Sequence, residues 1–282
     1  MNKKDSTRMS KVIKSSLEED IKSGDITTLA TVKKKQKATA EFLVKENGII
    51  AGLSIAKKVF KQVDPKLRLK IFIKDGSTVK HGDVIAVVEG KASSILTAER
   101  TALNFLQRMS GIATATFLYQ EKIKHTKAKI IDTRKTAPGL RLFDKMAVNI
   151  GGAENHRMGL YDGVLIKDNH IAVCGGIANA VEKARQAISH LVKVEVEAAT
   201  FQEVASALSA GADIIMLDNM DLDQIRQAVR MIDKQALVEV SGGVTRERLL
   251  ELAQTGVDLI SIGALTHSAV AVDLSMRIEA GN

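Results

Sequence analysis

The sequence of 282 residues has little cysteine and few aromatic residues: it contains one cysteine, Cys174, and no tryptophan. A single cysteine cannot form an internal disulfide or a cysteine-rich zinc site, so both are excluded. Aromatic residues make up only 3% of the chain, which leaves few rings on which nucleic-acid bases could stack. We therefore expect a reducing, cytoplasmic setting and no nucleic-acid partner.

Long apolar runs are also missing. No stretch approaches the roughly 20 apolar residues of a membrane-spanning helix, and no apolar segment follows the basic N-terminus as it would in a secretory signal. Acidic residues are fewer than basic ones, 33 against 41, which gives a formal net charge of +8. The sequence predicts no membrane partner, and its charge suggests anionic ligands such as phosphorylated small molecules.

The second half of the chain repeats short apolar runs with amphipathic stretches between them. Three of these stretches have helical periodicity, at 177–189, 222–232 and 245–256, the last with Thr245 as the expected N-cap and Gly256 as the expected C-cap. This alternation predicts βαβ units with buried parallel strands. We expect six strands, at 129–132, 163–166, 193–197, 213–217, 236–240 and 258–262.

Nearly every expected strand is followed by polar or glycine residues. Because the carboxyl ends of parallel strands converge on the active site in α/β barrels, this recurrence favours a barrel over an open doubly wound sheet, which stays the alternative. Six strands are too few for a closed barrel of eight. The residues at these ends are Asp132, Arg134, Lys135, Lys167, Asp168, Glu197, Asp218, Ser241, Gly242 and Gly263.

Residues 1–128 follow a different pattern. A helix is expected to stop at Gly24, strand-like alternation covers 38–52 and 67–90, and a long helix is expected over 97–124. The fold class is therefore α/β. An N-terminal α+β domain at 1–128, with the long helix as connector, precedes an incomplete (β/α) barrel at 129–282.

Residues 75–92 also resemble half of a biotinyl or lipoyl carrier domain, with Lys91 in the place of the modified lysine. Such a domain continues with further strands, whereas here a helix follows at once. The simpler interpretation is a β-rich module with an ordinary turn at Gly82.

Three cations crowd the segment TRKTAPGLR at 133–141: Arg134, Lys135 and Arg141. Like charges repel, so the cluster is either a solvated surface loop or a site for a strongly anionic ligand. Arg141 is the expected start of a helix and is set apart from the other two.

The chain resembles quinolinate phosphoribosyltransferase, also called nicotinate-nucleotide pyrophosphorylase (carboxylating), over nearly its whole length. Eight segments carry the resemblance in order: EEDIKSGDITT, ERTALNFLQRMSGIAT, TRKTAPGLR, NHRMGLYDGVLIKDNH, VEVE, MLDN, SGG and SIGALTHS. The resemblance implies formation of nicotinate mononucleotide from quinolinate and phosphoribosyl pyrophosphate, with Mg²⁺ and with release of carbon dioxide and pyrophosphate. It also implies an N-terminal α/β sandwich domain followed by an incomplete α/β barrel, and a homodimer or an assembly of dimers.

The implied substrates explain the crowded cations. Two carboxylates and the phosphates of the sugar donor total roughly −6 to −7 in charge, since each phosphate contributes about −1.5 to −2. The resemblance places Arg134, His156, Arg157 and Lys167 around the quinolinate carboxylates, because the planar guanidinium matches a carboxylate. It places Lys135 near the donor phosphates, and it implies that Arg100 crosses into the neighbouring subunit's site.

The acids have a separate role. Glu197 and Asp218 end consecutive expected strands and match the family's acids, which stabilise an oxocarbenium-like transition state and hold ribose hydroxyls and Mg²⁺. With Lys167 they form the expected catalytic set, and the two acids are the expected metal ligands. Glu195 shares a strand face with Glu197 and is a supporting candidate.

Glycine-rich turns after the last two strands are the expected phosphate sites, because late barrel loops often bind phosphate. Their residues are Ser241, Gly242, Gly243, Gly263, Ala264 and His267.

Three alternatives remain at this stage: a related phosphoribosyltransferase for another anionic heteroaromatic acid, a Schiff-base aldolase using Lys167, and a basic nucleic-acid-binding module.

Overall fold

The computed structural model describes residues 3–280, with side chains from residue 5 on. These residues form two compact units. The first contains the residues up to 117, residues 136–152 and the residues from 266 on, and the second contains residues 118–135 and 153–265. Each unit is therefore built from segments that are distant in the chain.

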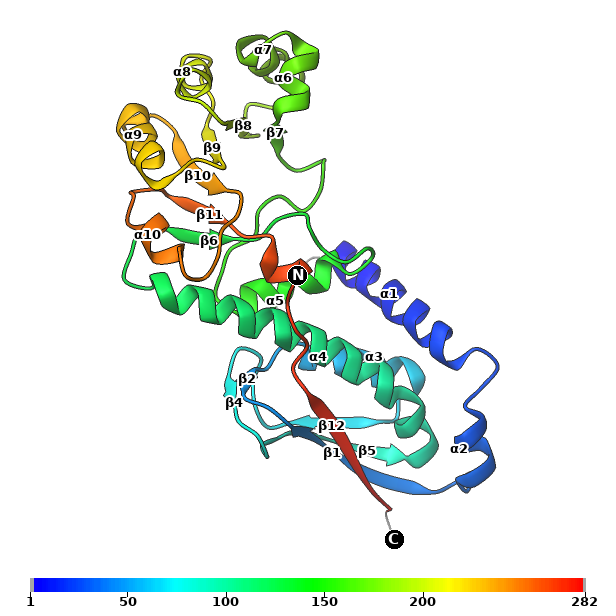
Figure 1. The fold of residues 1–282 in the computed structure, drawn as a ribbon. Helices are drawn as coiled ribbons and strands as arrows, with labels where there is room; N and C mark the ends of the chain where they lie inside the picture. The colour runs from blue at the N-terminus through cyan, green and yellow to red at the C-terminus, as the bar shows by residue number, and fades with distance from the viewer. Residues whose placement is uncertain (1–2, 281–282) are drawn as a thin grey trace. The chain divides into compact units, whose positions relative to one another are not determined.

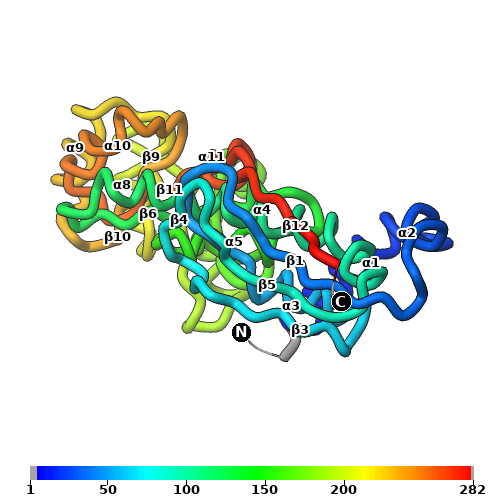
Figure 2. The backbone as a smooth tube through the Cα atoms, turned by 90° about the horizontal axis from the view of Figure 1, so that it is seen from below, coloured from blue at the N-terminus to red at the C-terminus, as the bar shows by residue number. Residues whose placement is uncertain are grey.

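The first unit contains a four-stranded antiparallel sheet in the order β12-β1-β5-β3. Figures 1 and 2 show β12, β1 and β5 running side by side. A small ladder of β2 and β4 accompanies this sheet. The strands are β1 Lys37–Val44, β2 Gly48–Ile49, β3 Arg68–Ile71, β4 Thr78–Val79, β5 Val84–Lys91 and β12 Leu274–Ala280.

Alternating side chains hold this sheet to its helices. The even-numbered residues of β1, from Ala38 to Val44, are buried, as the two-residue period of a strand requires. Phe42 meets Phe60 of α3 edge to face, with 5.8 Å between ring centroids. The helices are α1 Lys3–Ile21, α2 Ile26–Thr31, α3 Leu53–Val63, α4 Ala92–Ile123 and α5 Arg141–Ile150.

The stop that the sequence predicts at Gly24 is confirmed. Gly24 has φ 133°, in the region that favours glycine, and Asp25 caps the next helix by accepting the Thr28 N–H at 2.9 Å. Hydrogen bonding from Thr28 lowers the pKa of the Asp25 carboxyl.

Arg108 of α4 and Asp144 of α5 form a buried ion pair in the first unit. The guanidinium donates two hydrogen bonds to the carboxylate, at 2.8 and 2.7 Å, and the Asp144 side chain is fully buried. The Ala137 N–H donates to the same carboxylate at 3.2 Å. Asp144 therefore fixes α4, α5 and the segment that leads into α5.

The second unit contains six parallel strands in the order β6-β11-β10-β9-β8-β7 (Figure 1). All six lie where the sequence predicts them, and the incomplete barrel is confirmed. The strands are β6 Lys129–Ile131, β7 Val164–Ile166, β8 Val194–Ala198, β9 Ile214–Asp218, β10 Leu237–Ser241 and β11 Leu259–Ser261. The edge strands β6 and β7 are not paired in this order, and β6 instead meets Glu154 through one bridge at Ile131.

Helices follow the strands. They are α6 Asp168–Cys174, α7 Ile177–Ala187, α8 Phe201–Ser209, α9 Leu222–Ile232, α10 Leu249–Ala253 and α11 Ala264–His267. The predicted helix at 222–232 is confirmed at both ends, and Asp221 caps it. The predicted N-cap at Thr245 is wrong: α10 begins at Leu249 after Arg248 and ends before Gln254, so Gly256 does not cap it either. In the described part of the chain, no helix has the length and apolarity to cross a membrane.

We expect Asp144→Ala to lower the free energy of unfolding by about 3 kcal/mol, because the change leaves Arg108 without its buried partner. Glu121→Ala, which removes the exposed Lys124 pair of the same helix, should cost at most about 0.5 kcal/mol. Urea denaturation of both variants measures the difference. Equal losses in the two variants would contradict the role given to Asp144.

Candidate active site

Polar side chains gather at the carboxyl ends of the parallel strands. Asp132 follows β6 and Lys167 follows β7. Glu197, Asp218 and Ser241 lie within the last two residues of β8, β9 and β10. Asp218 and Ser241 are register partners in the ladder between β9 and β10. The fold therefore brings these predicted residues to one edge of one sheet.

An ion pair joins two of these strand ends. Lys167 Nζ lies 2.5 Å from Glu197 Oε2, and the Glu197 side chain is only 16% exposed. The Lys167 side chain is 45% exposed, so it lacks the apolar, desolvated pocket that activates a Schiff-base lysine. The geometry thus disfavours the aldolase alternative and leaves Lys167 as a cation at the sheet edge.

Two arginines add positive charge to the same unit. Arg157 donates from Nη1 to the Gly163 carbonyl at 2.9 Å, which fixes the guanidinium against its own loop. Burial lowers the pKa of Arg157, and the positive charge of Arg134 lowers it further. Two guanidinium groups close enough to repel each other form a site to which an anion would bind favourably.

His156 belongs to a hydrogen-bond cluster with two buried acids. Its Nε2 is 3.0 Å from Glu195 Oε2 and 3.8 Å from Glu239 Oε2. The His156 N–H donates to Asp132 Oδ1 at 2.8 Å. The three side chains offer metal-ligand atoms within 4.8 Å of one another, the one such group of three among the residues that the structure describes.

Glu239 is absent from the predicted site, and Glu195 is only a supporting candidate there. Both are buried in the middle of their strands, and burial followed by the charge of Glu195 raises the pKa of Glu239 to about 9. A signal was present: each acid stands between two valines of an otherwise apolar strand, in VEV at 194–196 and again at 238–240. A charged residue at such a position is rarely a core residue without a partner.

The predicted phosphate-binding loops have only part of the expected geometry. Gly242 and Gly243 have φ 85° and 56°, so SGG forms a turn that other residues would strain. A side chain at Gly242 would also meet Asn219 Oδ1 at 2.3 Å, beside Asp218. Because α10 starts only at Leu249, no helix N-terminus directly follows this turn.

The remaining predicted residues are spread over both units. Lys135 is exposed, and its N–H donates to Thr133 Oγ1 at 3.0 Å. Gly263 and Ala264 stand where β11 gives way to α11. Arg100 and His267 belong to the first unit, where Arg100 lines a cavity of about 350 Å³ with Glu19, Asp20 and Arg108, among others.

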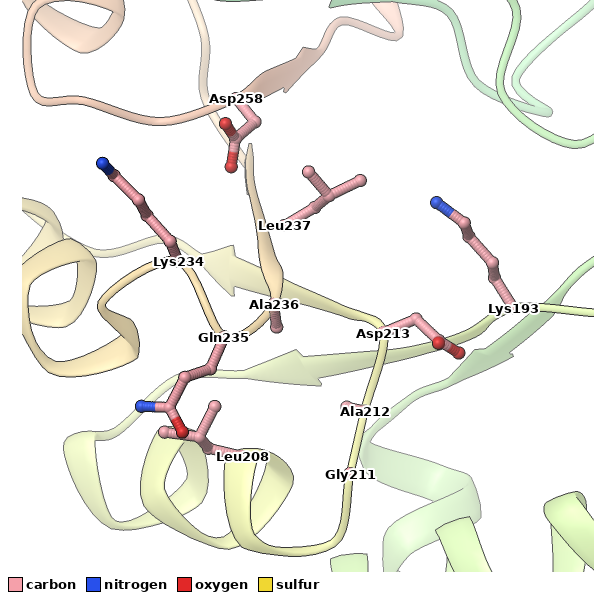
Figure 3. A pocket seen from close by; sticks show the side chains of 10 residues that line it. All are labelled: Lys193, Leu208, Gly211, Ala212, Asp213, Lys234, Gln235, Ala236, Leu237 and Asp258. Atoms are coloured by element: carbon pink, nitrogen blue, oxygen red, sulfur yellow. The ribbon is translucent and has the colours of Figure 1, made fainter.

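A larger cavity, about 500 Å³, lies at the amino ends of the parallel strands (Figure 3). Its acids already have partners: Asp213 Oδ2 accepts from Val194 N and from Arg185, and Asp258 Oδ2 accepts from Val238 N. These contacts tie neighbouring strands together. We therefore assign this end of the barrel to stability rather than to chemistry.

Comparison with known proteins gives consistent matches over both parts of the chain. The family models of the quinolinate phosphoribosyl transferase N-terminal and C-terminal domains match residues 25–110 and 112–277. The chain is 45% identical over 287 residues to the chloroplastic nicotinate-nucleotide pyrophosphorylase (carboxylating) of Arabidopsis thaliana, covering 95% of this chain and 82% of the relative.

A mitochondrial quinolinate phosphoribosyltransferase (decarboxylating) 2b of Nicotiana tabacum is 43% identical over 290 residues, with 96% and 82% coverage. Among solved structures, NadC from Streptococcus pyogenes matches with TM-score 0.94 and 39% identity, covering 98% of both chains. The nicotinate-nucleotide pyrophosphorylase of Francisella tularensis matches with TM-score 0.92 and 41% identity, covering 97% of this chain and 96% of that one.

We expect the stability of the protein to fall as pH rises from about 5 to about 9, in part through Glu239. With its pKa raised to about 9, the folded protein keeps a proton in this window that the unfolded chain has released. Unfolding therefore releases a proton, which lowers the free energy of unfolding by at most about 1.4 kcal/mol per pH unit.

In Glu239→Gln this contribution disappears, so the free energy of unfolding should fall less steeply with pH than in the parent. The control Glu251→Gln, an exposed acid of α10, should keep the parent slope. Denaturant titrations at pH 5, 7 and 9 measure the slopes, and an unchanged slope in Glu239→Gln would contradict the assignment.

Proposed function

Because the chain belongs to the quinolinate phosphoribosyl transferase family, we propose that it transfers the phosphoribosyl group of phosphoribosyl pyrophosphate to quinolinate. The products are nicotinate mononucleotide, pyrophosphate and carbon dioxide, as in de novo NAD biosynthesis. The observation that supports this most directly is the pair of mutually repelling arginines, Arg134 and Arg157, in the unit where Lys167 and Glu197 join two strand ends.

The cations serve as a clamp for the two quinolinate carboxylates. Arg134, Arg157 and Lys167 supply the positive charge, and a planar guanidinium can hold a carboxylate through two parallel hydrogen bonds. Bound carboxylates would relieve the repulsion between the arginines. Lys135 extends the positive charge toward the phosphates of the sugar donor.

The acids serve the reacting sugar. As the pyridine nitrogen attacks the anomeric carbon, pyrophosphate leaves and positive charge develops on the ribose ring. Carboxylates at Glu197 and Asp218 stabilise this charge and accept hydrogen bonds from ribose hydroxyls. Lys167 holds Glu197 in place, and Asn219 donates to Asp218 Oδ2 at 2.8 Å.

Mg²⁺ fits this set of donors. The ion binds one or two carboxylates and completes its shell with water and substrate phosphates, and Glu197 and Asp218 supply two carboxylates at the ends of neighbouring strands. When bound, Mg²⁺ would neutralise charge on the pyrophosphate. The turn of Ser241, Gly242 and Gly243, with Gly263 and Ala264 of the same unit, is the proposed region for the phosphate groups.

Loss of carbon dioxide follows glycosyl transfer, since the positive charge of the quaternised ring nitrogen stabilises the electron pair that the departing carboxylate leaves on ring carbon C2. C2 then takes up a proton from the solvent to give nicotinate mononucleotide. The protein has to orient the 2-carboxylate and exclude water around it. His156, 15% exposed and anchored by Glu195 and Asp132, is suited to that orienting role.

We also propose that the enzyme is a homodimer, or an assembly of dimers, in which Arg100 reaches the partner's site. Its place on α4, among residues of the first unit rather than of the barrel, is compatible with such a role. A cytoplasmic location is a further proposal, based on the single cysteine.

The function is tested by incubating the protein with quinolinate, phosphoribosyl pyrophosphate and Mg²⁺. We expect nicotinate mononucleotide and an equal amount of carbon dioxide. Nicotinate in place of quinolinate is the control and should give no carbon dioxide. Product without carbon dioxide, or no product from quinolinate, would contradict the proposal.

We expect Arg157→Ala to raise the KM for quinolinate about tenfold to hundredfold, because it removes a charged contact to the substrate. Asp218→Ala should instead lower kcat about a hundredfold, because it removes stabilisation of the transition state. Steady-state kinetics with each substrate varied separates the two effects. Arg226→Ala on the exposed face of α9 is the control, and the assignments fail if neither site variant differs from it.

Mixing two inactive variants tests the shared site. A heterodimer of Arg100→Ala and Lys167→Ala subunits contains one intact and one doubly altered site, so random exchange at equal amounts should restore about a quarter of the parent activity. A verified heterodimer that stays inactive would show that Arg100 does not act across subunits.

A further inference from the structure

Two buried carboxyl groups, those of Glu195 and Glu239, contact neither substrate nor reacting atoms in the proposed chemistry. The Glu195 and Glu239 side chains are 4% and 1% exposed. Oε1 of each has no hydrogen-bond partner among the described residues. Unpaired buried acceptors are costly, so a native fold that keeps two of them side by side requires an explanation.

The two ring nitrogens of His156 have different hydrogen-bond partners. The Arg157 N–H donates to His156 Nδ1 at 2.7 Å, so Nδ1 is the acceptor and the ring proton is on Nε2. That Nε2–H points to Glu195 Oε2 at 3.0 Å. Glu195 is therefore the acceptor that holds the imidazole in one tautomer and one orientation.

A proton on Glu239 would let the two carboxyl groups form a hydrogen bond with each other. Two ionised carboxylates only accept, so neither can bond the other, but a protonated Glu239 donates its O–H to Glu195. Glu195 then accepts one hydrogen bond from Glu239 and one from His156. Burial and the charge of Glu195 raise the pKa of Glu239, which agrees with this placement of the proton.

We propose that Glu239 is a positioning residue for the quinolinate clamp: as a neutral acid it anchors Glu195, which orients His156 and, through Nδ1, the backbone N–H of Arg157. The chain of contacts runs from the middle of β10 to the loop that carries Arg157. Asp132 secures the same loop from β6 by accepting the His156 N–H. The inference rests on the proposed function for its kinetic test, which measures the KM for quinolinate.

The test compares three substitutions on β10. Glu239→Leu removes the donor, and we expect the KM for quinolinate to rise at least about tenfold while the KM for phosphoribosyl pyrophosphate stays within about twofold. Glu239→Gln retains an N–H donor and should stay within about threefold of the parent for both substrates. Val240→Ala, a buried neighbour whose side chain points to the other face, controls for general loosening of the strand.

The ring of His156 gives a second readout that does not need catalysis. Nitrogen-15 spectra, with His156→Gln for assignment, should show the Nε2–H tautomer in the parent and in Glu239→Gln, but not as the single form in Glu239→Leu. If the parent forms no product from quinolinate, the proposed function fails while this readout still tests the inference.

Two results would overturn the inference. One is a folded Glu239→Leu protein with the parent tautomer and the parent KM for quinolinate. The other is one tightly bound divalent metal ion per chain, found by elemental analysis in the parent and lost in both Glu239 variants, because a metal ion and not a proton would then bridge the carboxylates.

Discussion

Repulsion between the positive charges of Arg134 and Arg157 is the constraint on which the site in the second unit depends. Burial and then the charge of Arg134 lower the pKa of Arg157, whereas Glu195 and Asp162 raise it, so Arg157 lies between a repelling cation and attracting acids. Fixed contacts, such as the bond from Arg157 to the Gly163 carbonyl, hold the guanidinium in place without help from an anion. A site organised in this way loses little conformational freedom when its ligand arrives.

Four acids of the barrel differ in depth and in their contacts. Glu197 and Asp218 lie at the strand ends, partly exposed, where they can meet a substrate. Glu195 and Glu239 lie deeper on the same strands or their neighbours and contact His156 instead. The two-residue period of a strand explains why Glu195 and Glu197 face the same side yet reach different depths.

Much of the barrel could be predicted from the sequence because each strand is a short apolar run that ends in a polar residue. The six strands and the helix at 222–232 follow from local pattern alone. The start of α10 did not, since Thr245 has the right side chain for a cap but the chain turns once more before the helix begins. The helix α3 was missed because strand-like alternation continues up to its first residues.

Long-range pairing was harder to predict. Nothing local in 274–280 shows that this segment joins β1, because pairing depends on the partner as well as on the strand itself. The contacts of Glu239 were equally hard to predict. Its position between two valines marks it as unusual, but only the fold reveals that it faces Glu195 and His156. The assigned roles of the strand-end residues stay predictions that kinetics can test.

The pairing of β12 with β1 has a consequence for how the protein is made. β1 leaves the ribosome early, while the strand that covers its outer edge is synthesised long after β5 has covered the other. Throughout that interval the nascent sheet presents an open row of backbone donors and acceptors, which can recruit strands from other chains. Slow translation or premature termination before residue 274 should therefore favour aggregation, and chaperones that shield strand edges should matter most during that interval.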